Sequence, residues 1–456
     1  MIEYICSLAE HVVFAITTGG MQRRTFLQHV FTTSVAFAIA PSAELRVFQQ
    51  PRVNGVRLNS HLRELSRFGR NDKGGVTRVA YSEADRQARA YVMNLMREAA
   101  LAVRIDTAGN IIGRREGRDR TLPALMTGSH IDSVPEGGNY DGPVGSMGAI
   151  EVAHALEEAR ITLQHPLEVV IFQNEENGKI GSKAMRGQDP STYLDLKTHS
   201  GKTVREGTRF IGGDPDRITE ARRAPGSIAA CVELHIEQGA VLESAGIDIG
   251  VVQGIVGIKR WAVTVTGFAN HAGTTPMDRR QDALLAAARF IDAVHRVARA
   301  TPGRHVATVG VIAAEPGAPN VIPGRATLQL EIRDLEMPSI DRLYDSLVRD
   351  SQTIGAQTGT RFEFAQIYRT EPAAATPRIQ DAIEAVARGL RLTTIRLPSG
   401  AGHDAQEIAQ LGPMGMIFIP SRGGISHSAD EYSGPEQITA GANVLLQTII
   451  TLDLAL

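Results

Sequence analysis

The chain has 456 residues, more than a single hydrophobic core usually spans, so we expect two or more domains. Hydrophobic residues make up 43% and charged residues 21%, which is the balance of a globular protein. The formal net charge of −2 leaves no basic excess for phosphate groups, so we expect no nucleic acid as a partner. The only cysteines, Cys6 and Cys231, cannot build a disulfide framework or a cysteine-based zinc site. Any metal ion must therefore be held by histidines and carboxylates.

Residues 1–43 have the composition of an export signal. Arg23 and Arg24 precede a moderately apolar stretch at 30–40, and small residues at 38–43 offer cleavage sites. The arginine pair resembles a twin-arginine signal, with Met21 as an alternative start and an ordinary N-terminal helix as the alternative interpretation. The apolar stretch is too short and too polar to span a membrane, so we expect no stable membrane anchor. The expected location is periplasmic or secreted, and cytoplasmic if the signal is not used.

Strands that alternate with helices predict an α/β fold for both flanks of the chain. Ser82 and Asp85 form a capping pair that opens a helix, and the apolar residues up to Ala99 follow helical spacing. Another helix is predicted at 145–160, and buried strands are predicted at 122–127, 167–172, 231–234 and 414–419. This order favours a mostly parallel sheet, in a catalytic domain made of residues 44–253 and 370–456.

The segment 254–369 between these flanks has a different pattern. Its predicted strands lie at 258–266, 306–313, 326–333 and 361–367, and its predicted helices at 282–298 and 339–354. The order β-α-β-β-α-β is that of a ferredoxin-like unit. Because this unit interrupts the α/β pattern, we expect a discontinuous catalytic domain with a smaller domain inserted into it.

Histidines and acidic residues follow the ends of the predicted strands. In chain order they are His130, Asp132, Asp141, Glu175, Glu176, His235 and His427. Sites in such sheets lie at the carboxyl ends of the strands, so these side chains are expected to meet. Imidazole nitrogen and carboxylate oxygen are ligands of zinc and related ions, and this inventory suits two ions that share one bridging carboxylate. Asp132 is close enough to His130 to orient a ligand imidazole.

Seven short motifs occur in order along the chain. They are Gly128–Ser133, Tyr140–Gly142, Asn174–Glu176, Leu234–Gly239, Ala269–Met277, Pro319–Gly324 and Ser426-His427. Each is weak alone, but together they resemble the N-carbamoyl-L-amino-acid hydrolase, β-ureidopropionase and allantoate amidohydrolase family, from about Arg57 to the C-terminus. The resemblance implies two divalent metal ions per subunit, with zinc, manganese or cobalt as candidates. It also implies cleavage of the carbamoyl (ureido) group of a small carboxylate substrate, such as an N-carbamoyl-L-amino acid, with release of ammonia and carbon dioxide.

The resemblance also implies a role for each matched residue. Asp141 would bridge the two ions, and the remaining ligands would be His130, Glu176, His235 and His427. Glu175, which lies beside a ligand, would be the general base. His271 would stabilise the oxyanion in the active site of the partner subunit, so the smaller domain would serve as a lid and dimerisation domain of a homodimer. The substrate would contact Gln238, Asn320 and Arg333, with Arg333 on its carboxylate and His403 nearby.

Several alternatives stay open. Arg333 could pair with Asp334 at the surface, Asp282 could cap a helix, and His403 could belong to a tight turn. The loop at 177–182 departs from the Gly-Ser-Arg-Phe that the family more often has there, which leaves the substrate preference open.

Two other functions are also consistent with such a scaffold. A metallopeptidase or N-acyl-amino-acid deacylase is the alternative enzyme, although such relatives typically have Asp where this chain has His235. A non-catalytic periplasmic binding protein is the alternative without chemistry. The intact Glu175 argues against a binding protein, because a binder does not need a base.

Overall fold

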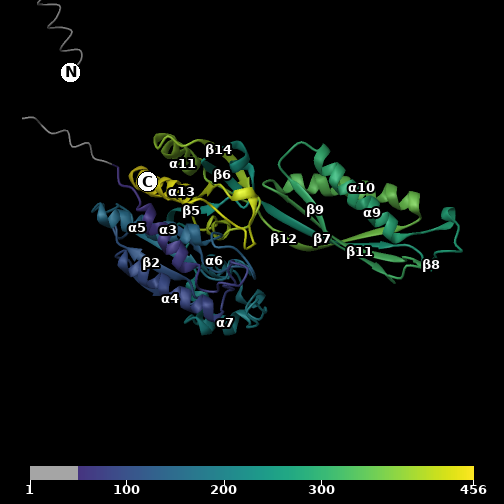
Figure 1. Cartoon of the computed structure of the whole chain (residues 1–456), viewed down its shortest axis with the longest axis horizontal. Coiled ribbons are helices and arrows are strands. Elements are labelled where there is room, and N and C mark those ends of the chain that lie inside the picture. Colours follow the sequence, from purple (N-terminus) through teal and green to yellow (C-terminus); the bar gives the residue numbers. More distant parts are fainter. Residues whose placement is uncertain (1–49) are drawn as a thin grey trace, which may run out of the picture. The chain divides into compact units, whose positions relative to one another are not determined.

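The computed structural model describes residues 50–456, so the predicted export signal lies outside the described residues. A nine-stranded sheet, in the order β1-β2-β4-β3-β5-β15-β6-β13 with β14 beside β6, organises the larger part of the chain (Figure 1). Its strands are β1 Ala102–Ile105, β2 Ile111–Arg115, β3 Ala124–His130, β4 Leu167–Phe172, β5 Ile228–Ile236, β6 Ile249–Ile255, β13 Ala373–Ala374, β14 Thr394–Ser399 and β15 Met414–Ile419. The central strands β4, β3, β5 and β15 are parallel, and antiparallel pairs join β1 to β2, β2 to β4 and β15 to β6. The expected mixed α/β fold with a mostly parallel central sheet is confirmed.

Helices cover this sheet, which explains why β3, β4 and β15 are buried along their whole length. The helices of this part are α3 Gly55–Leu65, α4 Glu83–Glu98, α5 Pro143–Glu158, α6 Ile180–Arg186, α7 Val204–Phe210, α8 Val241–Ala245, α11 Pro377–Gly389, α12 Asp404–Ile408 and α13 Pro435–Ala455, with short 3-10 turns at Pro190–Thr192, Pro215–Ala221 and Arg422–Gly424. The predicted cap is present, because the Ser82 side chain accepts a hydrogen bond from the backbone N–H of Asp85 at 3.1 Å. Helix α13 is long and apolar enough to pass a length-and-composition test for a membrane span, but most of it is buried against α5, β5 and β15.

A separate antiparallel sheet, in the order β12-β7-β11-β9, forms the inserted segment. Its strands are β7 Gly257–Thr266, β9 Val306–Glu315, β11 Arg325–Asp334 and β12 Arg361–Thr370, and its helices are α9 Ala283–Ala300 and α10 Met337–Thr358. The paired short strands β8 Asn270–His271 and β10 Val321–Ile322, with a 3-10 turn at Met277–Arg279, lie beside it in the chain. Both helices lie on one face of this sheet (Figure 1), so strand β7 alternates between buried and half-exposed residues.

The order of elements in this segment is the one predicted from the sequence. The alternative role considered for Asp282, that of a helix cap, is confirmed, because its side chain accepts a hydrogen bond from the backbone N–H of Leu285 at the start of α9. The two sheets are joined by short connections, Val256 between β6 and β7 and residues 371–372 between β12 and β13. The residues Pro51–Leu456 form one unit, so the domain boundaries at 254 and 369 stay predictions.

Candidate metal centre

Two histidines face each other at the carboxyl ends of the neighbouring parallel strands β3 and β5. The register pairs Thr127 with Val232, and three residues further along each strand it places His130 level with His235. Their ring centroids are 6.1 Å apart, and both side chains are almost completely buried. The observed strands extend to these histidines, beyond the shorter strands expected from the sequence, and this length brings the two rings together.

Backbone carbonyls fix the tautomer of both imidazoles. Nδ1 of His130 lies 3.0 Å from the carbonyl oxygen of Asp132, and Nδ1 of His235 lies 2.9 Å from the carbonyl oxygen of Ile236. Because a carbonyl only accepts, each Nδ1 carries the proton and donates it. In the neutral imidazole each Nε2 therefore presents a lone pair, as a metal ligand must.

Asp141 lies between these histidines, directly before α5. Its Oδ1 is 3.2 Å from Nε2 of His235 and 3.8 Å from Nε2 of His130. The next residue, Gly142, has a φ of +80°, and a Cβ there would lie 2.4 Å from Cε1 of His130. Only glycine allows the chain to pass this close to the imidazole ring, which explains the Asp-Gly pair of the motif.

Two sets of three potential ligands share Asp141. The first set is His130, Asp141 and His235, and the second is Asp141, Glu176 and His427, with ligand atoms within 4.8 Å of one another in each set. In the second set Nε2 of His427 lies 3.1 Å from Oδ2 of Asp141 and 3.5 Å from Oε2 of Glu176. All five residues predicted as ligands are thus brought together, and the carboxylate predicted to bridge stands in both sets.

The turn after β4 carries Glu175 and Glu176. The carboxylate of Asp132 accepts hydrogen bonds from both of their backbone N–H groups, at 3.3 and 3.2 Å. Asp132 thus orients the His130 ring through its main-chain oxygen and the glutamate turn through its side chain. Glu175 belongs to neither ligand set, and its Oε2 lies 3.9 Å from Nε2 of His130.

Burial and crowded negative charge raise the pKa values of both glutamates well above the usual range. For Glu175 the neighbouring charges are those of Asp404, Glu176 and Asp132, and for Glu176 they include Asp141. A cluster of carboxylates this dense stabilises any cation that enters it. It also gives Glu175 a carboxyl group that can hold a proton near neutral pH.

The histidines and Asp141 respond differently. Burial lowers the pKa of His130 to about 4, which keeps this imidazole neutral. Burial opposes the ionised form of Asp141, yet the neighbouring imidazoles of His235 and His427 hold the pKa of this carboxyl well below its usual range. Burial also opposes protonation of His235, but Asp141 raises the pKa of this imidazole to about 9. The site therefore strongly favours positive charge between His235 and Asp141.

These residues fit divalent cations by their donor atoms. The first set offers two imidazole nitrogens and a carboxylate oxygen, and the second offers one nitrogen and two oxygens. Such mixed sets suit zinc and related first-row ions. Among residues 50–456, the buried Nε2 of His235 has no hydrogen-bond partner, although it lies 3.2 Å from Oδ1 of Asp141. A metal ion is the kind of partner that would satisfy this atom.

Two of the predicted substrate residues, Gln238 and His403, contact candidate metal ligands, and a third, Arg333, contacts the carbonyl of Gly400. Nε2 of Gln238 donates to Oδ2 of Asp141 at 2.6 Å. The ring of His403 packs edge-on against that of His235, 4.4 Å between centroids, and its Nε2 lies 2.8 Å from Oγ of Ser399. The alternative in which Arg333 pairs with Asp334 is wrong. Arg333 donates from Nε to Glu331 at 2.7 Å and from its terminal nitrogen to the carbonyl of Gly400 at 2.7 Å.

His271 and Asn320 are not joined to the cluster. Within residues 50–456, neither makes a hydrogen bond or an ion pair with a candidate metal ligand, and both side chains are exposed. Nδ1 of His271 accepts hydrogen bonds from the backbone N–H groups of Gly273 and Thr274 at 3.0 and 3.2 Å. Its proton therefore lies on Nε2, which is free to donate to a partner.

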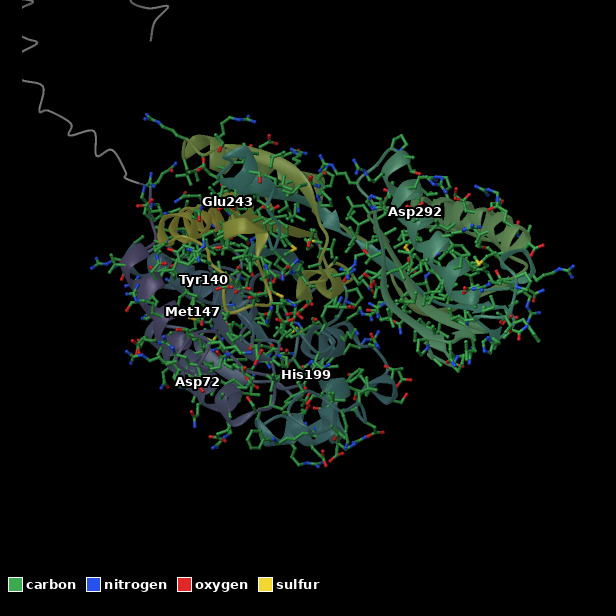
Figure 2. All side chains as sticks on the ribbon, turned by 45° about the vertical axis from the view of Figure 1, so that its right-hand side comes forward. Asp72, Tyr140, Met147, His199, Glu243 and Asp292 are labelled. Atoms are coloured by element: carbon green, nitrogen blue, oxygen red, sulfur yellow. The ribbon has the colours of Figure 1, made fainter. Side chains whose placement is uncertain are left out.

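Glu431 belongs to this site, although no motif pointed to it. Its carboxylate accepts from the backbone N–H groups of Tyr140 and Asp141 at 2.8 and 3.0 Å, and from Oγ of Ser426 at 2.7 Å. Oγ of Ser426 also lies 2.9 Å from Oδ2 of Asp141. Tyr140, labelled in Figure 2, marks this corner of the site. The only sequence signal was an acidic residue shortly after His427, and acidic residues at that spacing are usually solvated.

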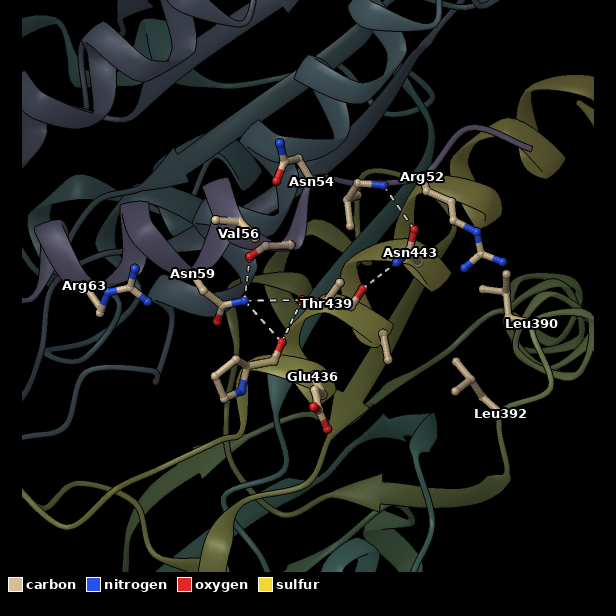
Figure 3. Close-up of a pocket in the computed structure, with 14 residues that line it drawn as sticks. Arg52, Asn54, Val56, Asn59, Arg63, Leu390, Leu392, Glu436, Thr439 and Asn443 are labelled. Carbon is tan, nitrogen blue, oxygen red and sulfur yellow. Dashed lines mark hydrogen bonds between the residues drawn. The ribbon is translucent and has the colours of Figure 1, made fainter. Parts of the chain in front are cut away.

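A cavity of about 780 Å³ elsewhere in the fold is a separate feature (Figure 3). It lies between α3 and α13 and includes Arg52, Arg63 and Glu436. None of its lining residues is a candidate ligand or a predicted substrate residue.

Comparisons with known proteins identify the family of the chain. Residues 126–451 match peptidase family M20/M25/M40. An N-carbamoyl-L-amino acid amidohydrolase of Geobacillus stearothermophilus is 40% identical over 402 residues, covering 87% of this chain and 98% of that protein. An allantoate amidohydrolase of Bacillus subtilis is 34% identical over 404 residues, covering 87% and 97%. A crystal structure of a hydantoinase/carbamoylase family amidase from Burkholderia multivorans is similar with a TM-score of 0.81 and 36% identity, covering 89% of this chain and 99% of that one.

These matches confirm the family resemblance that the seven motifs indicated. The match covers nearly the whole of each relative, so the chain has both the large sheet and the inserted segment in common with them. The chain therefore belongs to peptidase family M20/M25/M40, in its N-carbamoyl-L-amino-acid and allantoate amidohydrolase branch of hydrolases that act on carbon–nitrogen bonds other than peptide bonds.

Proposed function

We propose that the protein cleaves the carbamoyl group of a small carboxylate-bearing ureido compound, such as an N-carbamoyl-L-amino acid. The observation that carries this proposal is Glu175, a carboxylate with only 11% of its side chain exposed, which lies outside both ligand sets but on the same turn as the candidate ligand Glu176. That is the place for a general base. The names of the relatives, which act on N-carbamoyl amino acids and allantoate, support a ureido substrate.

Two divalent ions are part of the proposal. His130 and His235 would hold one, Glu176 and His427 the other, and Asp141 would bridge them. When bound, the ions supply Lewis-acid polarisation of the carbonyl and lower the pKa of water. The native metal is proposed to be zinc, with manganese or cobalt as the other candidates.

The chain's own residues carry the proton. Glu175 removes a proton from the attacking water at its carboxylate, the water oxygen bonds to the ureido carbonyl carbon, and the carbon–nitrogen bond breaks. Glu175 then gives the proton to the departing nitrogen, so ammonia leaves. The carbamate that remains loses carbon dioxide and yields the amino acid. Arg333 has N–H groups beyond those given to Glu331 and Gly400, and these are proposed to bind the substrate carboxylate.

A homodimer would complete the site. His271 carries its proton on Nε2 and is exposed on the β8–β10 pair, so it can donate to an oxyanion in the partner subunit. Asn320, whose backbone carbonyl accepts from the N–H of Ala272 at 2.9 Å, would bind substrate there. The edge strand β9 exposes Val306, Val311 and Ile312, which is apolar surface suited to a protein interface.

The proposed location is the periplasm, reached through the twin-arginine-like segment around Arg23 and Arg24.

Ammonia release from a panel of substrates tests the function. The panel contains N-carbamoyl-L-amino acids, β-ureidopropionate and allantoate, with N-acetyl amino acids and dipeptides to represent the alternative enzymes. We expect turnover of at least one ureido compound, and loss of that turnover in His235→Ala. The matched control is His165→Ala, since His165 is also buried and lies 3.1 Å from Asp453, outside the ligand sets. Turnover of acetyl or peptide substrates alone would contradict the proposal.

A further inference from the structure

Lys179 has an unusual backbone conformation, and it lies just after the turn that carries Glu175 and Glu176. It has a φ of 56° and a ψ of 42°, a left-handed conformation that is uncommon for residues other than glycine, and it immediately precedes α6. Its backbone N–H donates to the carbonyl of Glu175 at 2.8 Å. Its side chain is buried, with Nζ 2.9 Å from Oε1 of Glu407 and 2.6 Å from Oε1 of Gln406. A left-handed residue persists when its surroundings fix it, and here these two contacts hold Lys179 in place.

Gln406 connects Lys179 to the joints between the two sheets. Its side-chain oxygen accepts from Lys179, while its Nε2 donates to the carbonyl of Val256 at 3.2 Å and to the carbonyl of Glu371 at 2.8 Å. Val256 is the connection between β6 and β7, and Glu371 belongs to the connection between β12 and β13. The buried side-chain amide of Gln406 therefore contacts both connections between the two sheets, and it also contacts Lys179.

We propose that Lys179 and Gln406 are positioning residues, which tie the turn carrying Glu175 to both connections of the four-stranded sheet. The inference rests on the proposed function, since it assigns a consequence to the base Glu175. Arg333 lies on the same inserted segment, as do His271 and Asn320. The link thus makes the placement of the base depend on the segment that supplies the proposed substrate contacts.

Two substitutions of Gln406 test whether its bonds to the two connections matter, or only its bond to Lys179. Gln406→Met removes all three hydrogen bonds. Gln406→Glu keeps an acceptor for Lys179 but cannot donate to the carbonyls of Val256 and Glu371. We expect kcat to fall about 10-fold to 100-fold in both variants, with KM within about twofold of the unaltered enzyme, because the base is displaced while the substrate contacts remain. A Gln406→Glu enzyme with unaltered kcat would overturn the proposal.

Lys179 supplies an independent test. Lys179→Met is expected to lower kcat as much as Gln406→Met, and the double variant should lose no more than about either single one, because both break the same link. Lys179→Arg should restore most of the rate, since it keeps a cation that reaches Gln406 and Glu407. The matched control is Gln380→Met, which removes a buried glutamine whose Nε2 donates to the carbonyl of Ala375 at 2.9 Å. Additive losses in the double variant, or a control that loses kcat equally, would count against the link.

A measurement without substrate keeps the inference separate from the proposed function. The backbone N–H groups of Lys179, Ile180 and Gly181 donate to the carbonyls of Glu175, Asn174 and Gln173. Hydrogen–deuterium exchange of a peptide covering 174–181 should be faster in both Gln406 variants than in the unaltered protein or in Gln380→Met. Unchanged protection would refute the link. If the unaltered protein cleaves no ureido compound, the proposed function fails while the exchange experiment still decides this inference.

Discussion

Replacing Glu175 by Gln should abolish turnover and leave the metal centre intact. The side chain lies outside both ligand sets, 3.9 Å from Nε2 of His130, so the amide removes no ligand. Glutamine has nearly the same shape as glutamate but cannot accept the proton of the attacking water. Loss of a general base typically costs about 10²–10⁴ in rate, which is about 3 to 5 kcal/mol of activation free energy. The change also removes one charge from a crowded set of carboxylates, so the melting temperature should not fall.

Glu176→Gln is the matched comparison, since it makes the same chemical change one residue away. A neutral amide is a poor ligand, and Glu176 is one of three donors in the second set. We expect this variant to hold about one ion per chain and the Glu175 variant to hold about two, measured by elemental analysis after incubation with zinc. Ammonia release is measured on the same samples. If Glu175→Gln loses metal while Glu176→Gln keeps metal and activity, the two roles are reversed; if neither change affects ammonia release, this cluster is not the active site.

Three further outcomes are expected. Removal of divalent ions with a chelator should abolish ammonia release, and it should lower the melting temperature because the carboxylates of the metal-free site repel one another. Both should recover when zinc, manganese or cobalt is added. Full activity in the presence of chelator would contradict the metal centre. Replacing Arg23 and Arg24 with Lys should retain the precursor in the cytoplasm, as fractionation would show, and unchanged periplasmic activity would count against the export signal. Val311→Lys on the edge strand β9 should give a monomer by light scattering with strongly reduced activity, and a fully active monomer would exclude the role of His271 across subunits.

The proximity of the candidate metal ligands was predictable because the fold brings strand ends together. His130 closes β3 and His235 lies one residue before the end of β5, so the parallel register alone places them side by side. The short separation between His130 and Asp141 in the chain also explains why Asp141 lies at the site. The glycine that follows Asp141 lets the start of α5 approach the His130 ring. The four-stranded segment was equally accessible, since alternation along β7 and helical spacing in α9 are local properties.

Features that depend on distant residues were not predictable. The antiparallel strands β1 and β2 at the edge of the large sheet are short and carry no chemical motif. Glu431 is 290 residues from Asp141 in the chain, and Gln406 is 227 residues from Lys179. Local pattern cannot assign partners across such separations, because an isolated glutamate or glutamine has the composition of an ordinary surface residue. Even Arg333, to which the family resemblance gave a role, has Glu331 and Gly400 as its partners instead of the adjacent Asp334.

The placement of Glu175 distinguishes catalysis from simple binding on this scaffold. A protein that only bound an anionic ligand would gain nothing from a buried carboxylate near the ligand, because like charges repel and burial adds a further cost. Asp132 holds the backbone of Glu175 and Glu176 with one carboxylate, so both side chains are fixed toward the cluster, although only Glu176 belongs to a ligand set. Proteins tolerate locally unfavourable arrangements where function requires them, and a second largely buried glutamate outside both ligand sets is such an arrangement. Proton transfer to and from substrate is the task that we propose for Glu175, and it is the task that Glu175→Gln is expected to remove while metal binding persists.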